Sequence, residues 1–160
     1  MGENVADFNE RDLRDALGRF ATGVTVVTTT SPAGPLGITA NSFASVSLAP
    51  PLVLWSPARH SRRFPAFEAA SHFAVHVLSA DQRPLAEAFS RAGEGWPEVA
   101  FTPGIGDAPL LDGCTARFEC RHDSAHDGGD HLIVVGEVLR LNRADRPPLL
   151  FHRGRYGTFA

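Results

Sequence analysis

The chain of 160 residues is long enough for one domain with a substantial core and too short for two comfortable ones, so we expect residues 1–160 to form one domain. A charged content of 21% and a net charge of −3 argue against a general nucleic-acid-binding protein. All 15 cationic side chains are arginine, which excludes a lysine Schiff base and a Walker-type phosphate loop.

The lack of a recognisable targeting signal and the spacing of the two cysteines both indicate a reducing compartment. The longest apolar stretches are far below membrane-spanning length, and the polar residues 1–10 lack a signal-peptide core, so we expect a cytoplasmic protein that does not enter a membrane. Cys114 and Cys120 are six residues apart on a strand-like run, which places them roughly 20 Å apart on one strand. We therefore expect two buried free thiols rather than a disulfide.

The first half of the chain predicts one helix, several strands and two shorter helices. Leucines and a phenylalanine at helical spacing predict a helix over 10–21, with Asn9 as its N-cap and Gly23 after its end. Runs rich in β-branched and apolar residues predict strands at 23–30, from Leu36, at 52–55 and at 73–78. The turn at 31–35 separates the first two strands, and short helices are predicted at 64–70 and 81–91.

The second half predicts a long loop followed by strands. Residues 93–113 are rich in Gly and Pro and are expected to form an extended surface loop. Strands follow at 115–121 and 132–142, with a short terminal segment around 149–159. Gly104 and Gly106 form no dinucleotide fingerprint, because no strand precedes them and no helix follows. Many strands with few helices indicate an antiparallel barrel rather than alternating βα units.

The segment GITANSFASVSLAPP, residues 37–51, is rich in small hydroxyl-bearing side chains. A plain edge strand would explain these hydroxyls as facing solvent. Alternatively, small residues allow a flat polar ligand to lie against the backbone, where N–H and C=O groups meet ring atoms and hydroxyls reach a phosphate. Pattern alone leaves both interpretations open.

A resemblance to a known family favours the second interpretation. FATGVTVVTT followed by GITANSFASVSLAPPLVLW resembles the opening of the flavin reductase family, which includes the reductase partners of two-component flavin monooxygenases. HFAVHVL, GGDHLIVVGEV and RGRYG then follow in the expected order. The resemblance implies an FMN-binding split β-barrel, mainly β with flanking helices, antiparallel and Greek-key-like.

The resemblance also implies which residues bind flavin. The TANS strand residues are implied to lie near the isoalloxazine ring and ribityl chain, and the SVS residues to continue the wall: Thr39, Ala40, Asn41, Ser42, Ser45, Val46 and Ser47. Ser61 and Arg62 match the family's phosphate-binding loop, with Arg63 as a substitute. Without the resemblance, Arg59, Arg62 and Arg63 could equally be solvated loop charges.

The histidine-rich run HDSAHDGGDH, residues 122–131, has two possible interpretations. Imidazoles and carboxylates at close spacing could form a metal site from His122, His126 and His131. The resemblance instead assigns the Gly-Asp-His motif to nicotinamide binding, with His131 contacting the nicotinamide as the catalytic candidate and Asp130 orienting its ring. It gives His122 and His126 no role.

The terminal RGRYG motif is implied to help close the nicotinamide side of the site. Arg153 and Tyr156 are the best candidates in it, although Tyr156 could equally be a packing residue. Phe89, on the second short helix, could touch the flavin but is expected more often in a core.

The resemblance implies an NAD(P)H-dependent flavin reductase. FMN or FAD would lie along the hydroxyl-rich segment, and NADH or NADPH would donate a hydride at a separation of about 3–3.5 Å. A homodimer and a partner flavin-dependent monooxygenase are expected. Three alternatives remain open: a flavin binder without efficient NAD(P)H oxidation, an oxidase acting on another small molecule, and a metal enzyme using the three histidines.

Overall fold

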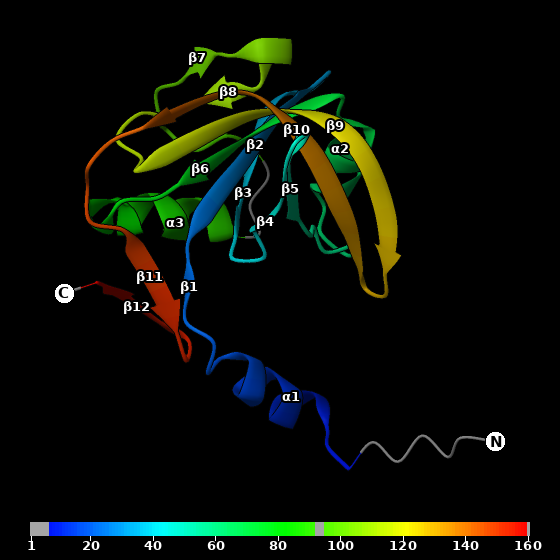
Figure 1. Cartoon of the computed structure of the whole chain (residues 1–160), viewed down its shortest axis with the longest axis vertical. Helices are drawn as coiled ribbons and strands as arrows, with labels where there is room; N and C mark the ends of the chain where they lie inside the picture. Colours follow the sequence, from blue (N-terminus) through cyan, green and yellow to red (C-terminus); the bar gives the residue numbers. More distant parts are fainter. Residues whose placement is uncertain (1–6, 92–94, 160) are drawn as a thin grey trace.

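The computed structural model describes residues 7–91 and 95–159 and is built on one large antiparallel sheet. Seven strands lie in the order β3-β2-β6-β9-β10-β5-β4, and the sheet curls strongly around its own core (Figure 1). The strands are β2 (Thr25–Ser31), β3 (Gly34–Ala40), β4 (Ala44–Leu48), β5 (Pro51–Trp55), β6 (His72–Val77), β9 (Ala116–Gly128) and β10 (His131–Arg143). This arrangement confirms the prediction of a mainly β, antiparallel fold.

The two edge strands of this sheet follow one another in the chain. β3 ends at Ala40 and β4 begins at Ala44, yet they occupy opposite edges of the sheet. The three residues between them therefore lie at the opening between the edges. Other strands also pair with strands that are distant in the chain, since β6 pairs with β2 and β5 pairs with β10. The seven strands thus form an open, split barrel rather than a closed one.

Two helices lie in the connections between strands. α2 (Phe64–Ala69) follows β5 and buries Phe64 and Phe67. α3 (Arg83–Ser90), preceded by a 3₁₀ turn (Ala80–Gln82), buries Ala86 and Phe89. Pro84 lies in the first turn of α3, where its missing N–H costs no hydrogen bond.

α1 (Glu10–Leu17) begins as predicted but ends earlier than predicted. Asn9 accepts a hydrogen bond from the Asp12 N–H, and its own N–H donates to the Asp12 carboxylate, which forms a capping box. The helix stops at Gly18 rather than near residue 21. The chain then turns, and β1 (Thr22–Gly23) pairs with β11 (Leu149–His152). α1 lies apart from the barrel and buries none of its residues (Figure 1).

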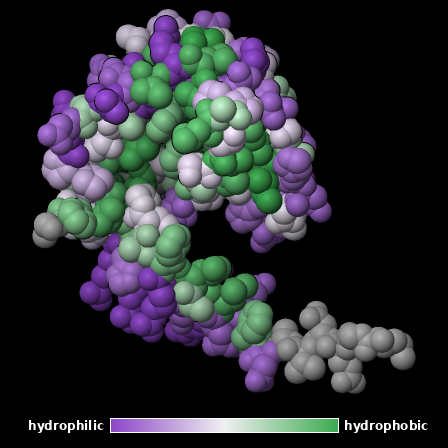
Figure 2. Space-filling view, in the orientation of Figure 1, coloured by the Kyte–Doolittle hydropathy of each residue, from purple (hydrophilic) through white to green (hydrophobic). Residues whose placement is uncertain are grey.

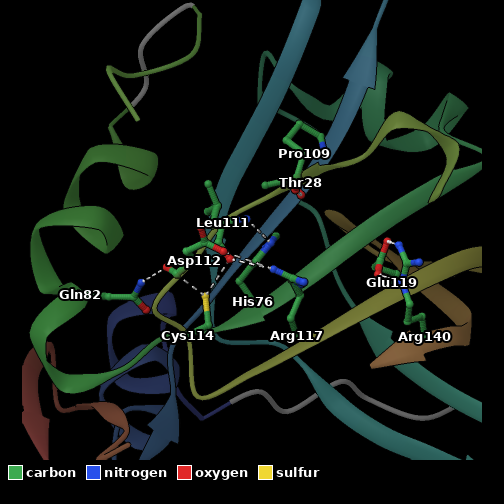
Figure 3. Close-up of polar contacts among 10 residues, drawn as sticks. All are labelled: Thr28, His76, Gln82, Pro109, Leu111, Asp112, Cys114, Arg117, Glu119 and Arg140. Carbon is green, nitrogen blue, oxygen red and sulfur yellow. Dashed lines mark hydrogen bonds and ion pairs between the residues drawn. The ribbon is translucent and has the colours of Figure 1, made fainter. Parts of the chain in front are cut away.

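The prediction of a surface loop at 93–113 is wrong for its second half. Residues 93 and 94 lie outside the described residues, but β7 (Thr102–Pro103) and β8 (Pro109–Leu110) form a small sheet, and residues 108–111 are buried. Figure 3 shows why this segment is held against the barrel: Thr28 donates to the carbonyl of Pro109 at 2.6 Å, and the N–H of Leu111 donates to His76. Hydrogen bonds to distant residues fix the segment.

The histidine-rich run forms strand rather than loop. β9 and β10 each span 13 residues, and only Gly129 and Asp130 make the turn between them. Gly129 has a positive φ of 74°, which glycine adopts without strain. The long hairpin therefore carries its tip well beyond the other strands (Figure 1).

The described interior is apolar, and neither cysteine forms a disulfide. Trp55, Phe67 and Phe73 pack together at ring-centroid distances of 5.1 and 6.3 Å. Cys120 is buried and Cys114 half-buried, and burial raises the pKa of their thiols to about 12 and 11. Cys114 precedes β9 rather than lying within it. Among the described helices, none is long and apolar enough to cross a membrane.

Candidate functional site

A pocket of about 210 Å³ lies where β3 ends. Its wall includes Thr39, Ala40 and Asn41 from β3 and the bend that follows, together with Tyr156 from β12 (Arg155–Thr158). The structure thus brings together three residues of the predicted flavin strand and one of the terminal motif, although more than 110 residues separate them in the chain. The lining is mainly apolar with a few polar groups, which suits a flat heteroaromatic ligand.

Two hydroxyls of the predicted flavin strand are engaged by the protein itself. Thr39 Oγ1 donates to the carbonyl of Ala86 in α3 at 2.6 Å. Ser42 Oγ accepts a hydrogen bond of 2.9 Å from the N–H of Ser56. Asn41 is exposed, and its side chain makes no hydrogen bond to any of the described residues. Thr39 therefore helps to fix the wall of the pocket, Ser42 ties the following bend to Ser56, and the Asn41 amide is available to a ligand.

The predicted continuation of the wall lies on β4. Ser45 and Ser47 pair with consecutive residues of β5, so Val46 forms a bulge between them. Ser45 and Val46 are exposed, and Val46 retains 47% of its exposure. β4 forms the opposite edge of the sheet from β3, and these three residues do not line the pocket beside Asn41.

The predicted phosphate loop, residues 56–63, is compact. The N–H of Ser61 donates to the carbonyl of Ala58 at 3.1 Å, and Ser61 Oγ accepts from the N–H of Arg63 at 3.2 Å. Arg62 is exposed. The Arg63 guanidinium is half-buried and donates to three backbone carbonyls, which leaves it a structural role rather than that of a substitute phosphate ligand.

The tip of the β9–β10 hairpin positions Asp130 and His131. His131 Nδ1 lies 2.7 Å from the Asp130 carboxylate, and this hydrogen bond lowers the pKa of Asp130. An Nδ1–H that donates to Asp130 leaves Nε2 of a neutral ring as an acceptor. His131 also pairs with Ala58, so the tip contacts the loop that contains Ser61.

The metal interpretation of the histidine-rich run lacks the required geometry. His122 and His126 lie four residues apart along β9, a separation of about 13 Å on an extended strand. Among residues 7–91 and 95–159, no group of three His, Cys, Asp or Glu side chains could hold a metal ion. His126 instead lies 3.2 Å from the hydroxyl of Ser124.

The terminal hairpin adds a larger, basic pocket of about 650 Å³. Arg153, Arg155 and His152 line it, together with Tyr156, which also lines the smaller pocket. Arg153 therefore lies in the larger pocket and does not line the smaller one. The guanidinium of Arg83 stacks over the Tyr156 ring at 5.2 Å, and burial raises the pKa of the phenol.

Sequence reasoning missed three residues of the smaller pocket, Val24, Ser90 and Phe151. It also left open the role of Phe89, which is 1% exposed and belongs to the core. A signal for this packing was present in Gly37, because a glycine inside a strand often marks a close approach by another group. A Cβ on Gly37 would lie 2.5 Å from the Phe89 ring.

Comparisons with known proteins agree with this geometry. The family model for flavin reductase-like domains matches residues 17–160. The FMN reductase (NADH) SmoA of Agrobacterium fabrum is 56% identical over 152 residues, which are 95% of this chain and 87% of that protein. The reductase subunit HsaB of a flavin-dependent monooxygenase from Mycobacterium tuberculosis is 40% identical over 155 residues, covering 94% of this chain and 83% of that protein.

A solved structure extends the similarity to the fold. The NADH:FAD oxidoreductase SgcE6 of Streptomyces globisporus, solved with NAD and FAD fragments, superposes with a TM-score of 0.91 at 40% identity. The similarity covers 99% of this chain and 98% of that one. The two chains are therefore similar in both fold and sequence over nearly their full lengths.

Proposed function

The chain belongs to the flavin reductase-like domain family, and on this premise we propose that it is an NAD(P)H-dependent flavin reductase. The reaction is hydride transfer from NADH or NADPH to FMN or FAD. The observation that supports this proposal most directly is the pocket at the end of β3, where Thr39, Ala40 and Asn41 meet Tyr156. A reductase needs one surface on which two flat rings can align, and the ligands themselves supply the redox chemistry.

The flavin side of the proposed site is built from main chain and small side chains. Asn41 offers an amide that both donates and accepts, while the neighbouring Thr39 is held by α3. Ser45, Val46 and Ser47 would extend this wall along β4, and Ser61 and Arg62 would hold the phosphate. Ser42 contributes by fixing the start of the 56–63 loop.

The nicotinamide side of the proposed site is the hairpin tip. Asp130 orients the His131 ring so that Nε2 is an acceptor for the carboxamide N–H of the nicotinamide. No proton has to leave or reach the protein during hydride transfer, so His131 acts by binding and alignment. Arg153 and Tyr156 would close this side from the terminal hairpin.

We also propose that the protein is a homodimer. α1 and its flanks expose large apolar side chains, with Phe8, Leu17 and Phe20 retaining 56%, 65% and 79% of their exposure. Figure 2 shows hydrophobic residues gathered on the side of α1 that faces a hollow next to the barrel. A monomer in water rarely leaves such a face uncovered, and a second copy of the chain would cover it symmetrically.

The reduced flavin would serve a partner flavin-dependent monooxygenase in the cytoplasm. The relatives described as reductase subunits support the partner, and the two free thiols suit a reducing compartment. Because the family match is one continuous stretch, we propose one domain over residues 1–160.

Steady-state oxidation of NADH and NADPH, with added FMN, FAD or riboflavin, tests this function. Flavin-dependent oxidation of at least one reduced nucleotide is the expected result. Comparing the three flavins also tests the phosphate loop, because riboflavin lacks the phosphate and should have the highest KM if Ser61 and Arg62 bind that group. Absence of oxidation with every pair would contradict the proposed function.

A further inference from the structure

The loop of residues 56–63 contacts both sides of the site through two arginines. It runs from the end of β5 to the start of α2. Arg59 lies near its middle and Arg63 at its end, and their side chains reach different parts of the fold. We call this segment the arginine loop.

Arg59 holds the tip of the β9–β10 hairpin by three contacts. Its backbone N–H donates to the carbonyl of Asp130 at 2.9 Å, and its Nε donates to the carbonyl of Gly129 at 3.0 Å. Its Nη2 lies 2.6 Å from the Asp127 carboxylate. Since Asp127 is 82% exposed, the ion pair alone contributes little to stability. The planar fork instead fixes the position of the turn that bears His131.

Arg63 joins the same loop to the flavin side. Its Nη1 donates to the carbonyls of Gly37 and Phe89, both at 2.8 Å. Its Nη2 donates to the carbonyl of Arg91 at 3.1 Å. Phe89 and Arg91 lie at the end of α3, where carbonyls lack partners within the helix. Gly37 lies on β3, two residues before Thr39, and Phe89 lies on α3, next to Ser90. Arg63 therefore connects the strand and the helix that both contribute to the smaller pocket.

The segment between the two arginines is internally hydrogen-bonded. The N–H of Ser61 donates to the carbonyl of Ala58, and the N–H of Phe64 donates to the carbonyl of Ser61 at 3.0 Å. The Arg59 guanidinium also lies 5.9 Å from the centre of the Phe64 ring. Because these hydrogen bonds hold the short segment together, we expect a displacement at one arginine to reach the other.

We propose that Arg59 and Arg63 are positioning residues through which the arginine loop couples flavin binding to nicotinamide binding. This inference rests on the proposed function. Flavin bound against β3 and Ser61 fixes the position of the loop, and Arg59 then holds the hairpin tip in the position that the nicotinamide requires. Coupling of this kind is reciprocal, and typical values change affinity by about fivefold or more.

The test is a binding measurement without turnover. The dissociation constant of oxidised NAD is measured by calorimetry with and without saturating FMN, for the wild type and for Arg59→Gln, Arg63→Gln and Arg59→Lys. In the wild type, FMN should tighten NAD binding by about fivefold or more. Either glutamine variant should lower this ratio to the value that ring stacking alone gives, and Arg59→Lys should keep only part of the difference, because an ammonium lacks the planar fork.

Arg121→Gln is the matched control. Arg121 also makes an exposed ion pair on β9, to Glu137 at 2.7 Å, but touches neither the tip nor the loop. It should leave the ratio unchanged. Stacking of nicotinamide on flavin could itself give a ratio above one, and that contribution would survive in Arg59→Gln. A ratio unchanged in both glutamine variants, or equally reduced in Arg121→Gln, would overturn the inference.

Failure of the inference is distinguishable from failure of the proposed function. If the wild type binds neither FMN nor NAD, the proposed function fails. If it binds both but FMN does not change the affinity for NAD, only the coupling is wrong. Melting temperatures of all variants, measured without ligands, identify any that are poorly folded, and a loss of stability with an unchanged ratio contradicts coupling.

Discussion

His76 Nε2 accepts a hydrogen bond from the backbone N–H of Leu111 at 3.0 Å, in a part of the protein where the imidazole is fully buried. Because Nε2 accepts, the proton of the neutral ring must be on Nδ1, which donates to the carbonyl of Val26 at 2.9 Å. His76 thereby links two strands of the sheet to the segment before β9 (Figure 3). His76 and Thr39 lie on the two strands that flank β2, and each of them pairs with Val26.

Burial of His76 predicts a loss of stability in acid. Desolvation lowers the pKa of its imidazole to about 4 from 6.5, so between these values the unfolded chain binds more protons than the folded one. The free energy of unfolding should therefore fall as pH drops from about 6.5 to about 4, by an amount on the order of 3 kcal/mol since one pKa unit is about 1.4 kcal/mol. Urea unfolding measured across this range checks the expectation.

His76→Gln should flatten this part of the stability profile, because glutamine does not titrate. Its stability at neutral pH should be lower, since the two hydrogen bonds are remade imperfectly. His152→Gln, which changes an exposed histidine, should keep the wild-type profile. An unchanged acid profile in His76→Gln would contradict the assignment.

Close packing of β3 against α3 predicts that Gly37→Ala is destabilising. The added Cβ would lie 2.5 Å from the Phe89 ring, which is itself buried, so ring and helix must shift. We expect a loss of about 1–3 kcal/mol in urea unfolding. Gly23→Ala is the control, since a Cβ there meets nothing within 4 Å. Equal stabilities of the two variants would rule out the close contact.

The sequence predicted most elements, and its errors share one physical cause. The helix after Asn9 was predicted too long because apolar spacing continues to Phe20, whereas the carbonyl of its C-cap Gly18 accepts a hydrogen bond from the distant Arg153 N–H. The loop at 93–113 was predicted at the surface because Gly and Pro are common there, whereas Leu111 is held by His76. In both cases long-range contacts overrode a local pattern.

In the candidate site too, the sequence indicated the residue types but not the role of each side chain. Small and hydroxyl-bearing residues were recognisable along β3, but which hydroxyls the protein itself uses depends on distant partners such as Ala86 and Ser56. Likewise, Arg59 and Arg63 look alike in the sequence, and only the fold shows that one holds the hairpin tip and the other the end of α3.

The two sides of the site predict separate effects of mutation. Asn41→Ala should raise the flavin dissociation constant about three- to tenfold, the range expected for one lost hydrogen bond, without changing the fold. Fluorescence titration with FMN measures this effect.

His131→Ala should instead raise the KM for the reduced nicotinamide several-fold and leave flavin affinity within about twofold. His126→Ala, on the same hairpin, is the control and should change neither quantity. If Asn41→Ala and His131→Ala had the same small effects on both ligands, the division of the site would be wrong.

The exposed face of α1 predicts the oligomeric state. Leu17→Asp would place a charge among apolar side chains buried between two copies, which disfavours association by several kcal/mol. Light scattering coupled to size exclusion should show a dimer for the wild type and a monomer, or a concentration-dependent mixture, for this variant. Arg11→Ala, on the same helix, should remain dimeric. A monomeric wild type would contradict the dimer.

Anaerobic rapid mixing tests whether hydride passes directly from nicotinamide to flavin within one site. The protein with FMN or FAD is mixed with reduced nicotinamide carrying deuterium at C4, and loss of the visible flavin absorbance is followed without oxygen. Rapid bleaching is expected that depends on the protein and is slower with deuterium than with hydrogen. Bleaching no faster than in protein-free solution, for either flavin and either nucleotide, would contradict it.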